Sequence, residues 1–251
     1  MQLIFYTLLS SQMSPQRESI FKFKQFRVKN EISAMKVGTD GVLLGAWADI
    51  SYASNILDIG TGTGLIALMV AQRSNATIIG VDIDYGATIE AIENINASPW
   101  SKRISIINND ITLVAKGLKN IDHIVSNPPF FENGILAPDL SRATARHCNS
   151  LNFSTLISIA KSILDINGKL SFISPYENRE NIIYHATLNN MNISRYTEVF
   201  SSPKKNIPVR ILWELTPQNT TTDKTQLYIR DINNQYSSEY INLTKDFYLN
   251  F

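Results

Sequence analysis

Four consecutive residues, Asn127-Pro128-Pro129-Phe130, carry groups that suit chemistry on a planar amine. Amide and carbonyl oxygens accept the hydrogens of an NH2 group, and an aromatic ring stacks on a planar molecule. The apolar run Ile121–Ser126 precedes them and predicts a buried strand. Because proline has no N–H for strand pairing, we expect the four residues to project beyond the sheet as a stiff loop. Taken alone, the pattern fits an ordinary proline-rich turn equally well.

A glycine-rich loop follows an earlier apolar run, Asn55–Ile59. Gly60, Gly62 and Gly64 permit a tight turn and let a ligand approach the backbone closely. Helix-forming, mostly apolar residues follow at 65–72, so the predicted order is strand, glycine loop and helix. The G-x-G-x-G spacing differs from that of dinucleotide-binding proteins, and no lysine stands where a P-loop needs one. Binding of a nucleoside triphosphate is therefore not expected.

Acidic residues end or follow the next two predicted strands. Asp82 ends the run Thr77–Asp82 roughly 20 residues after the glycines, where a carboxylate can accept both hydroxyls of a ribose. Asp84 is the less favoured candidate, and a solvated turn acid is the alternative for either residue. Asp110 follows Ile104–Asn108 and can accept from an adenine amino group. Polar strand ends separated by helical stretches predict an open parallel α/β sheet with its ligand crevice at the carboxyl ends.

These motifs together resemble the class I S-adenosylmethionine-dependent methyltransferases, on the pattern Asp58-x-Gly60-x-Gly62-x-Gly64, Asp82, Asp110 and Asn127-Pro128-Pro129-Phe130. Segments 23–26, 34–47 and 93–100 are similar to the bacterial tRNA1(Val) (adenine-N6)-methyltransferases, and the similarity extends from about Ile20 to Phe251. The family often has tyrosine where this chain has Phe130. Stacking survives that difference, whereas a hydroxyl hydrogen bond does not.

The resemblance implies a fold, a cofactor and a substrate. The expected fold is a Rossmann-like, mainly parallel seven-stranded sheet with helices on both faces. The expected reaction moves a methyl group from S-adenosylmethionine to N6 of an adenine in the anticodon loop of tRNA1(Val). We expect residues 20–251 to form one methyltransferase domain with an N-terminal cap segment at 20–50. Residues 1–19 would be a poorly defined extension, and either Met1 or Met13 can be the true start.

Site roles follow from the same resemblance. Asn127 and Pro128 would accept the hydrogens of N6, and Phe130 would stack on the base. Asp58 would order the glycine loop or meet the cofactor ammonium through water. The expected cofactor-binding residues are Lys36, Thr39, Asp40, Asp58, Gly60, Gly62, Gly64, Asp82, Asp110 and Asn127. For residues 36–40 the alternative is a helix start capped by Thr39 or Asp40, with Val42, Leu43, Leu44 and Trp47 in the core.

The charge distribution gives a weaker indication of an RNA partner. A formal net charge of +1 is not typical of proteins that bind nucleic acid through bulk charge. Basic residues occur in three groups: in the N-terminal segment, at 142–146 and at 204–210. The groups would form a rim for phosphates if they converged around the crevice, although each residue alone fits an ordinary solvated charge. The candidate RNA contacts are Lys24, Arg27, Arg142, Arg146, Lys204, Lys205 and Arg210.

Other site classes find little support in the sequence. The one cysteine, Cys148, cannot form an internal disulfide, which favours a reducing cytoplasm, and it lacks a convincing catalytic partner. His123, His147 and His185 are too scattered to predict a metal site. The apolar residues 3–9 are too few to span a bilayer. We therefore expect no metal and no membrane, and a monomer or weak dimer.

Two other functions remain open. One is methylation of a different planar amine, such as a guanine amino group of ribosomal RNA or a glutamine amide of a protein. Those enzymes commonly carry a duplicated or an additional helical domain, for which this chain is too short. The other is an RNA-binding module that senses the cofactor without turnover. The intact loop at 127–130 argues against it, because binding alone does not need an amine trap.

Overall fold

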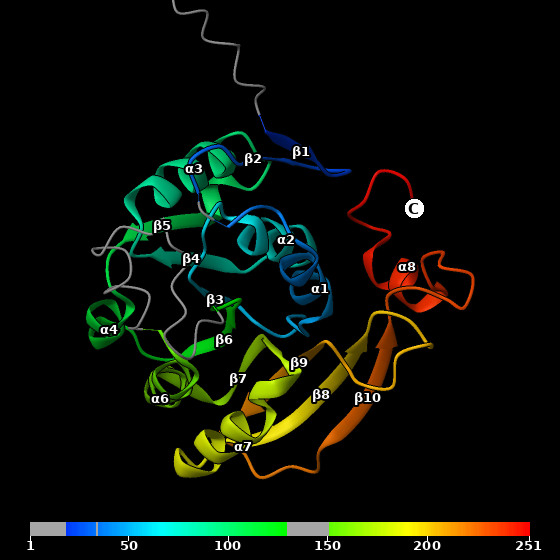
Figure 1. Ribbon diagram of the computed structural model, residues 1–251. Coiled ribbons are helices and arrows are strands. Elements are labelled where there is room, and N and C mark those ends of the chain that lie inside the picture. Colours follow the sequence, from blue (N-terminus) through cyan, green and yellow to red (C-terminus); the bar gives the residue numbers. More distant parts are fainter. Residues whose placement is uncertain (1–18, 34, 130–150) are drawn as a thin grey trace, which may run out of the picture.

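The computed structural model describes residues 19–33, 35–129 and 151–251, and within them one eight-stranded sheet forms the centre (Figure 1). The strand order is β10-β8-β9-β7-β6-β3-β4-β5. Only β9 runs against the others, pairing antiparallel with both β7 and β8. The strands are β3 (Asn55–Ile59), β4 (Thr77–Asp82), β5 (Ile104–Asn108), β6 (Ile121–Ser126), β7 (Leu164–Pro175), β8 (Asn192–Phe200), β9 (Arg210–Thr216) and β10 (Asp223–Tyr228).

The predicted fold class is confirmed, with one strand more than the expected seven. The edge strand β10 pairs in parallel with β8. Its first four residues are exposed, so the alternation of apolar and polar residues that marks a half-buried strand is missing. The polar stretch 218–223 predicts a surface loop between two late strands, and those strands are β9 and β10, with Asp223 already in β10.

Helices cover both faces of the sheet. Neighbouring residues of one strand enter different hydrophobic cores, because side chains in a strand alternate between the faces. In β3, Ile56 packs with α1, α2 and α3, whereas Leu57 packs with α6 and α7. The helices are α1 (Thr39–Trp47), α2 (Leu65–Arg73), α3 (Tyr85–Asn96), α4 (Ile111–Val114), α6 (Phe153–Ile163), α7 (Arg179–Leu188) and α8 (Ser238–Thr244), with short 3-10 turns at Ser101–Arg103, Ala115–Gly117 and Tyr176–Asn178.

A small hairpin precedes the sheet and meets the end of the chain. It consists of β1 (Ile20–Lys22) and β2 (Arg27–Lys29), which lie beside α3 in Figure 1. Lys24 Nζ donates to the carbonyls of Lys245 and Phe251 at 2.6 and 2.9 Å. The hairpin is therefore fixed between the sheet-covering helix α3 and the C-terminal segment.

Candidate active site

The glycine loop between β3 and α2 is fastened to the end of β4. Gly60, Gly62 and Gly64 have φ of +71°, +55° and +80°, a region that glycine adopts without steric cost. The N–H groups of Gly60 and Thr61 both donate to the carbonyl of Val81, at 2.8 and 3.1 Å. A Cβ built on Gly62 would meet no atom within 4 Å. The loop thus presents backbone to open space at the carboxyl edge of the sheet.

Asp82 holds the glycine loop from the end of β4. Its Oδ2 accepts the N–H of Gly62 at 2.8 Å, and its Oδ1 accepts the N–H of Asp84 at 2.9 Å. Burial raises the pKa of Asp82 above its ordinary value, and these backbone hydrogen bonds oppose the rise. Since each carboxylate oxygen has two lone pairs, Asp82 can accept further hydrogen bonds from a ligand.

Asp58 supports the loop from beneath. Its side chain is fully buried, and Oδ2 accepts the hydroxyl of Thr61 at 2.7 Å. Burial raises the pKa of Asp58 to about 7, although hydrogen bonds from Thr61 and the backbone of Ala67 lower it. The contacts of Asp58 are therefore with the loop and the first turn of α2.

Two further acids at the carboxyl edge begin helices. Asp84 Oδ1 accepts the N–H of Ala87 at 3.0 Å and caps α3. Asp110 Oδ1 accepts the N–H and the hydroxyl of Thr112, both at 2.8 Å, and caps α4. An aspartate directly before a helix is a strong capping signal that the sequence interpretation did not use. Asp110 thus lies at the predicted edge with one oxygen already engaged.

Residues 29–33, 35 and 36, here called the strap, cross α3 towards the loop at 127–129. The carboxylate of Glu90, which is 0% exposed, accepts the backbone N–H groups of Glu31, Ile32 and Ser33. The last two of these bonds measure 2.7 and 2.8 Å. Three donors converging on one buried carboxylate hold the strap in register along α3.

Asn94, one helical turn beyond Glu90, connects the strap to the glycine loop. Its Oδ1 accepts the N–H of Lys29 at 2.7 Å. Its Nδ2 donates to the carbonyls of Lys29 and Thr63, both at 2.9 Å. The roles of Glu90 and Asn94 were not predicted; buried polar residues spaced i, i+4 on one helix face were the available signal.

Asn127 stands at the end of β6 with one unsatisfied group. Its Nδ2 donates to the Sδ of Met35, on the strap, at 3.5 Å. Its Oδ1 is buried and has no hydrogen-bond partner among the described residues. Ser126 Oγ donates to the carbonyl of Ile59 at 2.8 Å, which joins the ends of β6 and β3. The structure thus places an unpaired acceptor beside the glycine loop; Phe130 lies outside the described residues.

Residues 36–40 run from the end of the strap into the first turn of α1. Lys36 Nζ donates to the carbonyl of Asn30 at 2.9 Å. Asp40 forms an ion pair with Arg210, with 2.9 Å between Oδ2 and Nε. The predicted cap by Thr39 or Asp40 is wrong, because the helix begins at Thr39 and Gly38 is the cap residue, without a side-chain bond. The predicted burial of Val42, Leu43, Leu44 and Trp47 is confirmed.

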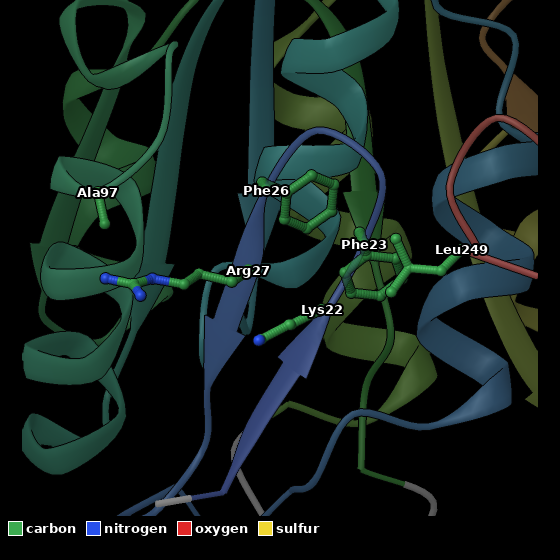
Figure 2. Close-up of a pocket in the computed structure, with 6 residues that line it drawn as sticks. All are labelled: Lys22, Phe23, Phe26, Arg27, Ala97 and Leu249. Carbon is green, nitrogen blue, oxygen red and sulfur yellow. The ribbon is translucent and has the colours of Figure 1, made fainter.

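The candidate RNA-binding residues do not all reach this edge. Arg210 begins β9 opposite Pro175, the last residue of β7, so Lys204 and Lys205 in the preceding loop lie at the carboxyl edge. Arg27 lines a cavity of about 350 Å³ with Ala97, at the far end of α3 (Figure 2). The length of α3 separates that cavity from the carboxyl edge by about 18 Å. Lys24 is engaged by the C-terminal segment. Arg142 and Arg146 lie outside the described residues.

The histidines that the structure describes are not grouped into a site. His123 is buried, with Nε2 2.9 Å from Ser171 Oγ and Nδ1 2.9 Å from the Tyr52 hydroxyl. Burial lowers the pKa of His123 to about 3, so the ring is neutral. Within residues 19–33, 35–129 and 151–251, no three His, Cys, Asp or Glu side chains are grouped to hold a metal ion. No helix in these ranges is long and apolar enough to cross a membrane. His147 and Cys148 lie outside them.

Known proteins resemble this chain in both sequence and fold. The Methyltransferase small domain family matches residues 38–202. The tRNA1(Val) (adenine(37)-N6)-methyltransferase of Phocaeicola vulgatus is 45% identical over 92% of this chain and 97% of its own length. The enzyme of the same name from Trichodesmium erythraeum is 44% identical over 92% and 98%. A predicted O-methyltransferase from Agrobacterium tumefaciens, 20% identical, superposes with a TM-score of 0.65 over 83% of this chain and 96% of its own.

Proposed function

Since this chain belongs to the tRNA1(Val) (adenine(37)-N6)-methyltransferase family, we infer that it transfers a methyl group from S-adenosylmethionine to N6 of adenine 37 in that tRNA. One observation carries the assignment of this chemistry to the carboxyl edge. Asn127 Oδ1 is buried and unpartnered beside a glycine loop that faces open space. A buried acceptor without a partner is costly, and an amine that donates to it removes that cost.

The residues around the glycine loop fit the cofactor. The open space at Gly62 lets a ligand lie against the backbone of the glycine loop at that residue. Asp82 would accept the ribose hydroxyls, and Asp110 would accept from the adenine through its carboxylate. Lys36, Thr39 and Asp40 would complete the site, with Lys36 near the carboxylate of the cofactor. When bound, S-adenosylmethionine supplies a methyl group already activated by its attachment to a sulfonium.

The protein's task is to align a weak nucleophile. The lone pair of adenine N6 is delocalised into the ring, so alignment and a partly localised lone pair matter more than a strong base. Asn127 Oδ1 and the Pro128 carbonyl each accept one N6 hydrogen, which favours a tetrahedral nitrogen with its lone pair directed at the methyl carbon. With the cofactor bound, N6 would take the methyl group as the sulfonium leaves as a neutral thioether, and N6 would then lose one proton to water.

The same two oxygens stabilise the positive charge that develops on N6. Positive charge develops on N6 as its new bond forms, and the two preorganised acceptors, Asn127 Oδ1 and the Pro128 carbonyl, lower the energy of that state. Phe130, outside the described residues, would stack on the target base. The base must leave the stack of the anticodon loop to reach these groups. A loop nucleotide is easier to extrude than a paired one, which suits a single-stranded target.

The tRNA partner would be held by basic residues around this edge. Lys204, Lys205 and Arg210 are supported by their position at the carboxyl ends of the strands. Arg142 and Arg146 would extend that rim, and Lys24 and Arg27 would add weaker contacts farther along the RNA.

We also propose that residues 20–251 act as one domain with a cap at 20–50. The protein would work in the cytoplasm, as a monomer or weak dimer.

Identification of the methylated nucleoside tests this function. The protein is incubated with labelled S-adenosylmethionine and either tRNA1(Val) transcript, the same transcript with guanine at position 37, bulk RNA or protein extract. Label in N6-methyladenosine from the first transcript, and none from the second, is the expected result. Label in guanine or glutamine, or no incorporation into any pool, would contradict the assignment.

A further inference from the structure

The loop between β8 and β9, residues 201–209, exposes an apolar side chain at the carboxyl edge of the sheet. Ile207 is 67% exposed, and Val209 beside it is 38% exposed. Lys204 and Lys205 are exposed on the same loop and form no ion pair with any described residue. An exposed apolar residue beside two cations fits a partner that offers both apolar surface and negative charge. A nucleic acid offers bases and phosphates in that combination.

The loop is held rigidly at both ends. The N–H of Lys205 donates to the carbonyl of Ser202 at 3.1 Å, and the N–H of Val209 donates to the carbonyl of Val199 at 2.8 Å. Pro203 and Pro208 restrict the backbone between these bonds. The ion pair of Arg210 with Asp40 ties the start of β9 to the first turn of α1. Ile207 is therefore presented on a preorganised support, so little ordering entropy is lost on contact.

Strand register gives the distance from Arg210, where this loop ends, to Ser126, the residue before Asn127. Ser126, before Asn127, pairs with Phe172 of β7, and Phe172 pairs with Trp213 of β9. Arg210 lies two strands away from β6 and three residues farther towards the carboxyl edge. Strand spacing and rise per residue place its Cα about 14 Å from that of Ser126. One extruded nucleotide, together with the side chains that contact it at either end, can span this distance.

We propose that Ile207 inserts into the stack of the anticodon loop and fills the space that the target adenine leaves when it is extruded. Lys204 and Lys205 hold the phosphates on either side of that space. Apolar side chains that enter a base stack in this way offset the energy lost by unstacking. The proposal rests on the proposed function, since it assumes that an RNA base reaches Asn127.

Two readouts test the insertion. The first is kcat/KM for methylation of the anticodon stem-loop by wild type, Ile207→Ala and Ile166→Ala. Ile166 is the matched control, because it is 66% exposed on β7 near the opposite edge of the sheet. We expect Ile207→Ala to lower kcat/KM about 10-fold and Ile166→Ala to change it less than about 2-fold, in keeping with an apolar side chain that offsets part of the cost of unstacking one base step.

The second readout reports extrusion directly and needs no turnover. A stem-loop with 2-aminopurine as the 3′ neighbour of the target adenine, which keeps its N6 amine, becomes brighter when the adenine leaves the stack. The increase in fluorescence at saturating protein should be at least about half smaller with Ile207→Ala than with wild type, and it should be unchanged with Ile166→Ala. This is expected if Ile207 supplies part of the energy of extrusion. Equal fluorescence and equal kcat/KM for Ile207→Ala and wild type would overturn the insertion. Failure of wild type to methylate any RNA would instead overturn the proposed function.

The contribution of Lys204 and Lys205 is tested separately, through the salt dependence of RNA binding. Replacing both, as Lys204→Ala with Lys205→Ala, should weaken stem-loop binding and reduce the slope of log affinity against log salt by about 1.4, or about 0.7 for each single-strand phosphate contact. Lys116→Ala with Lys119→Ala removes the same charge from the connection between α4 and β6. If that control changes the slope equally, the lysines act only through net charge and their assigned contacts are wrong.

Discussion

Met35 Sδ lies 3.5 Å from Nδ2 of Asn127, while Oδ1 of the same amide is buried without a partner among the described residues. A thioether sulfur only accepts hydrogen bonds, so it pairs with the NH2 end of the amide. The amide oxygen then has no partner and can accept a hydrogen bond from the substrate amine. Glu90 fixes the strap that carries Met35. The orientation of Asn127 therefore depends on a residue of α3 that contacts neither end of the amide.

Removal of the Asn127 side chain should affect methyl transfer far more than cofactor binding. We expect Asn127→Ala to lower the single-turnover rate about 100-fold, the cost typical of removing one preorganised polar group from a transition state. The dissociation constant for S-adenosylmethionine, measured by calorimetry, should change less than about 2-fold. Asn96→Ala, at an exposed position of α3, is the control. Unchanged turnover in Asn127→Ala would refute the mechanism.

Replacement of Met35 tests whether its sulfur orients Asn127. Met35→Leu keeps the apolar volume and loses the acceptor, so kcat should fall about 3- to 10-fold, the equivalent of one hydrogen bond. Met35→Gln restores an acceptor and should recover most of that loss. KM for S-adenosylmethionine should stay constant in both variants. A Met35→Leu enzyme with wild-type kcat would show that the sulfur does not set the amide orientation.

Glu90 and Glu93 lie on the same helix and should respond very differently to neutralisation. Glu90→Gln leaves one acceptor for three backbone N–H groups, and we expect the free energy of unfolding to fall by about 1–3 kcal/mol. Glu93 pairs with Lys29 at the surface, with 3.4 Å between its Oε2 and Nζ, and side-chain exposure of 53%. Glu93→Gln should therefore cost no more than about 0.5 kcal/mol. Urea denaturation measures the free energy of unfolding of both variants. Equal losses would contradict the role of Glu90 in holding the strap.

Asp58 should make stability depend on pH in a specific direction. Burial raises its pKa from 3.8 to about 7 in the folded protein. Between these values the folded protein keeps a proton that the unfolded chain has lost, so this residue makes the free energy of unfolding fall as pH rises. Asp58→Asn removes that dependence. The stability of the variant relative to wild type should rise from pH 4 to pH 7 in urea titrations, and a pH-independent difference would contradict the shifted pKa.

Much of the sheet was predictable because its signals are local. The predicted strands Asn55–Ile59, Thr77–Asp82, Ile104–Asn108 and Ile121–Ser126 all have the observed bounds. Each is a short apolar run that ends at glycine, proline or a polar residue, and these residues stop pairing wherever they stand. The α1 cap was misplaced because glycine takes the cap position without a side-chain bond.

The sequence by itself determined the two loops of the site. Three glycines at positive φ and two consecutive prolines dictate local backbone geometry, and parallel strands bring their carboxyl ends to one edge. Only the tertiary structure decided what surrounds them. Glu90 meets backbone groups 57 to 59 residues away, and Met35 meets Asn127 across 92 residues. Backbone N–H groups are the same in every residue, so only folding selects which of them a buried carboxylate binds.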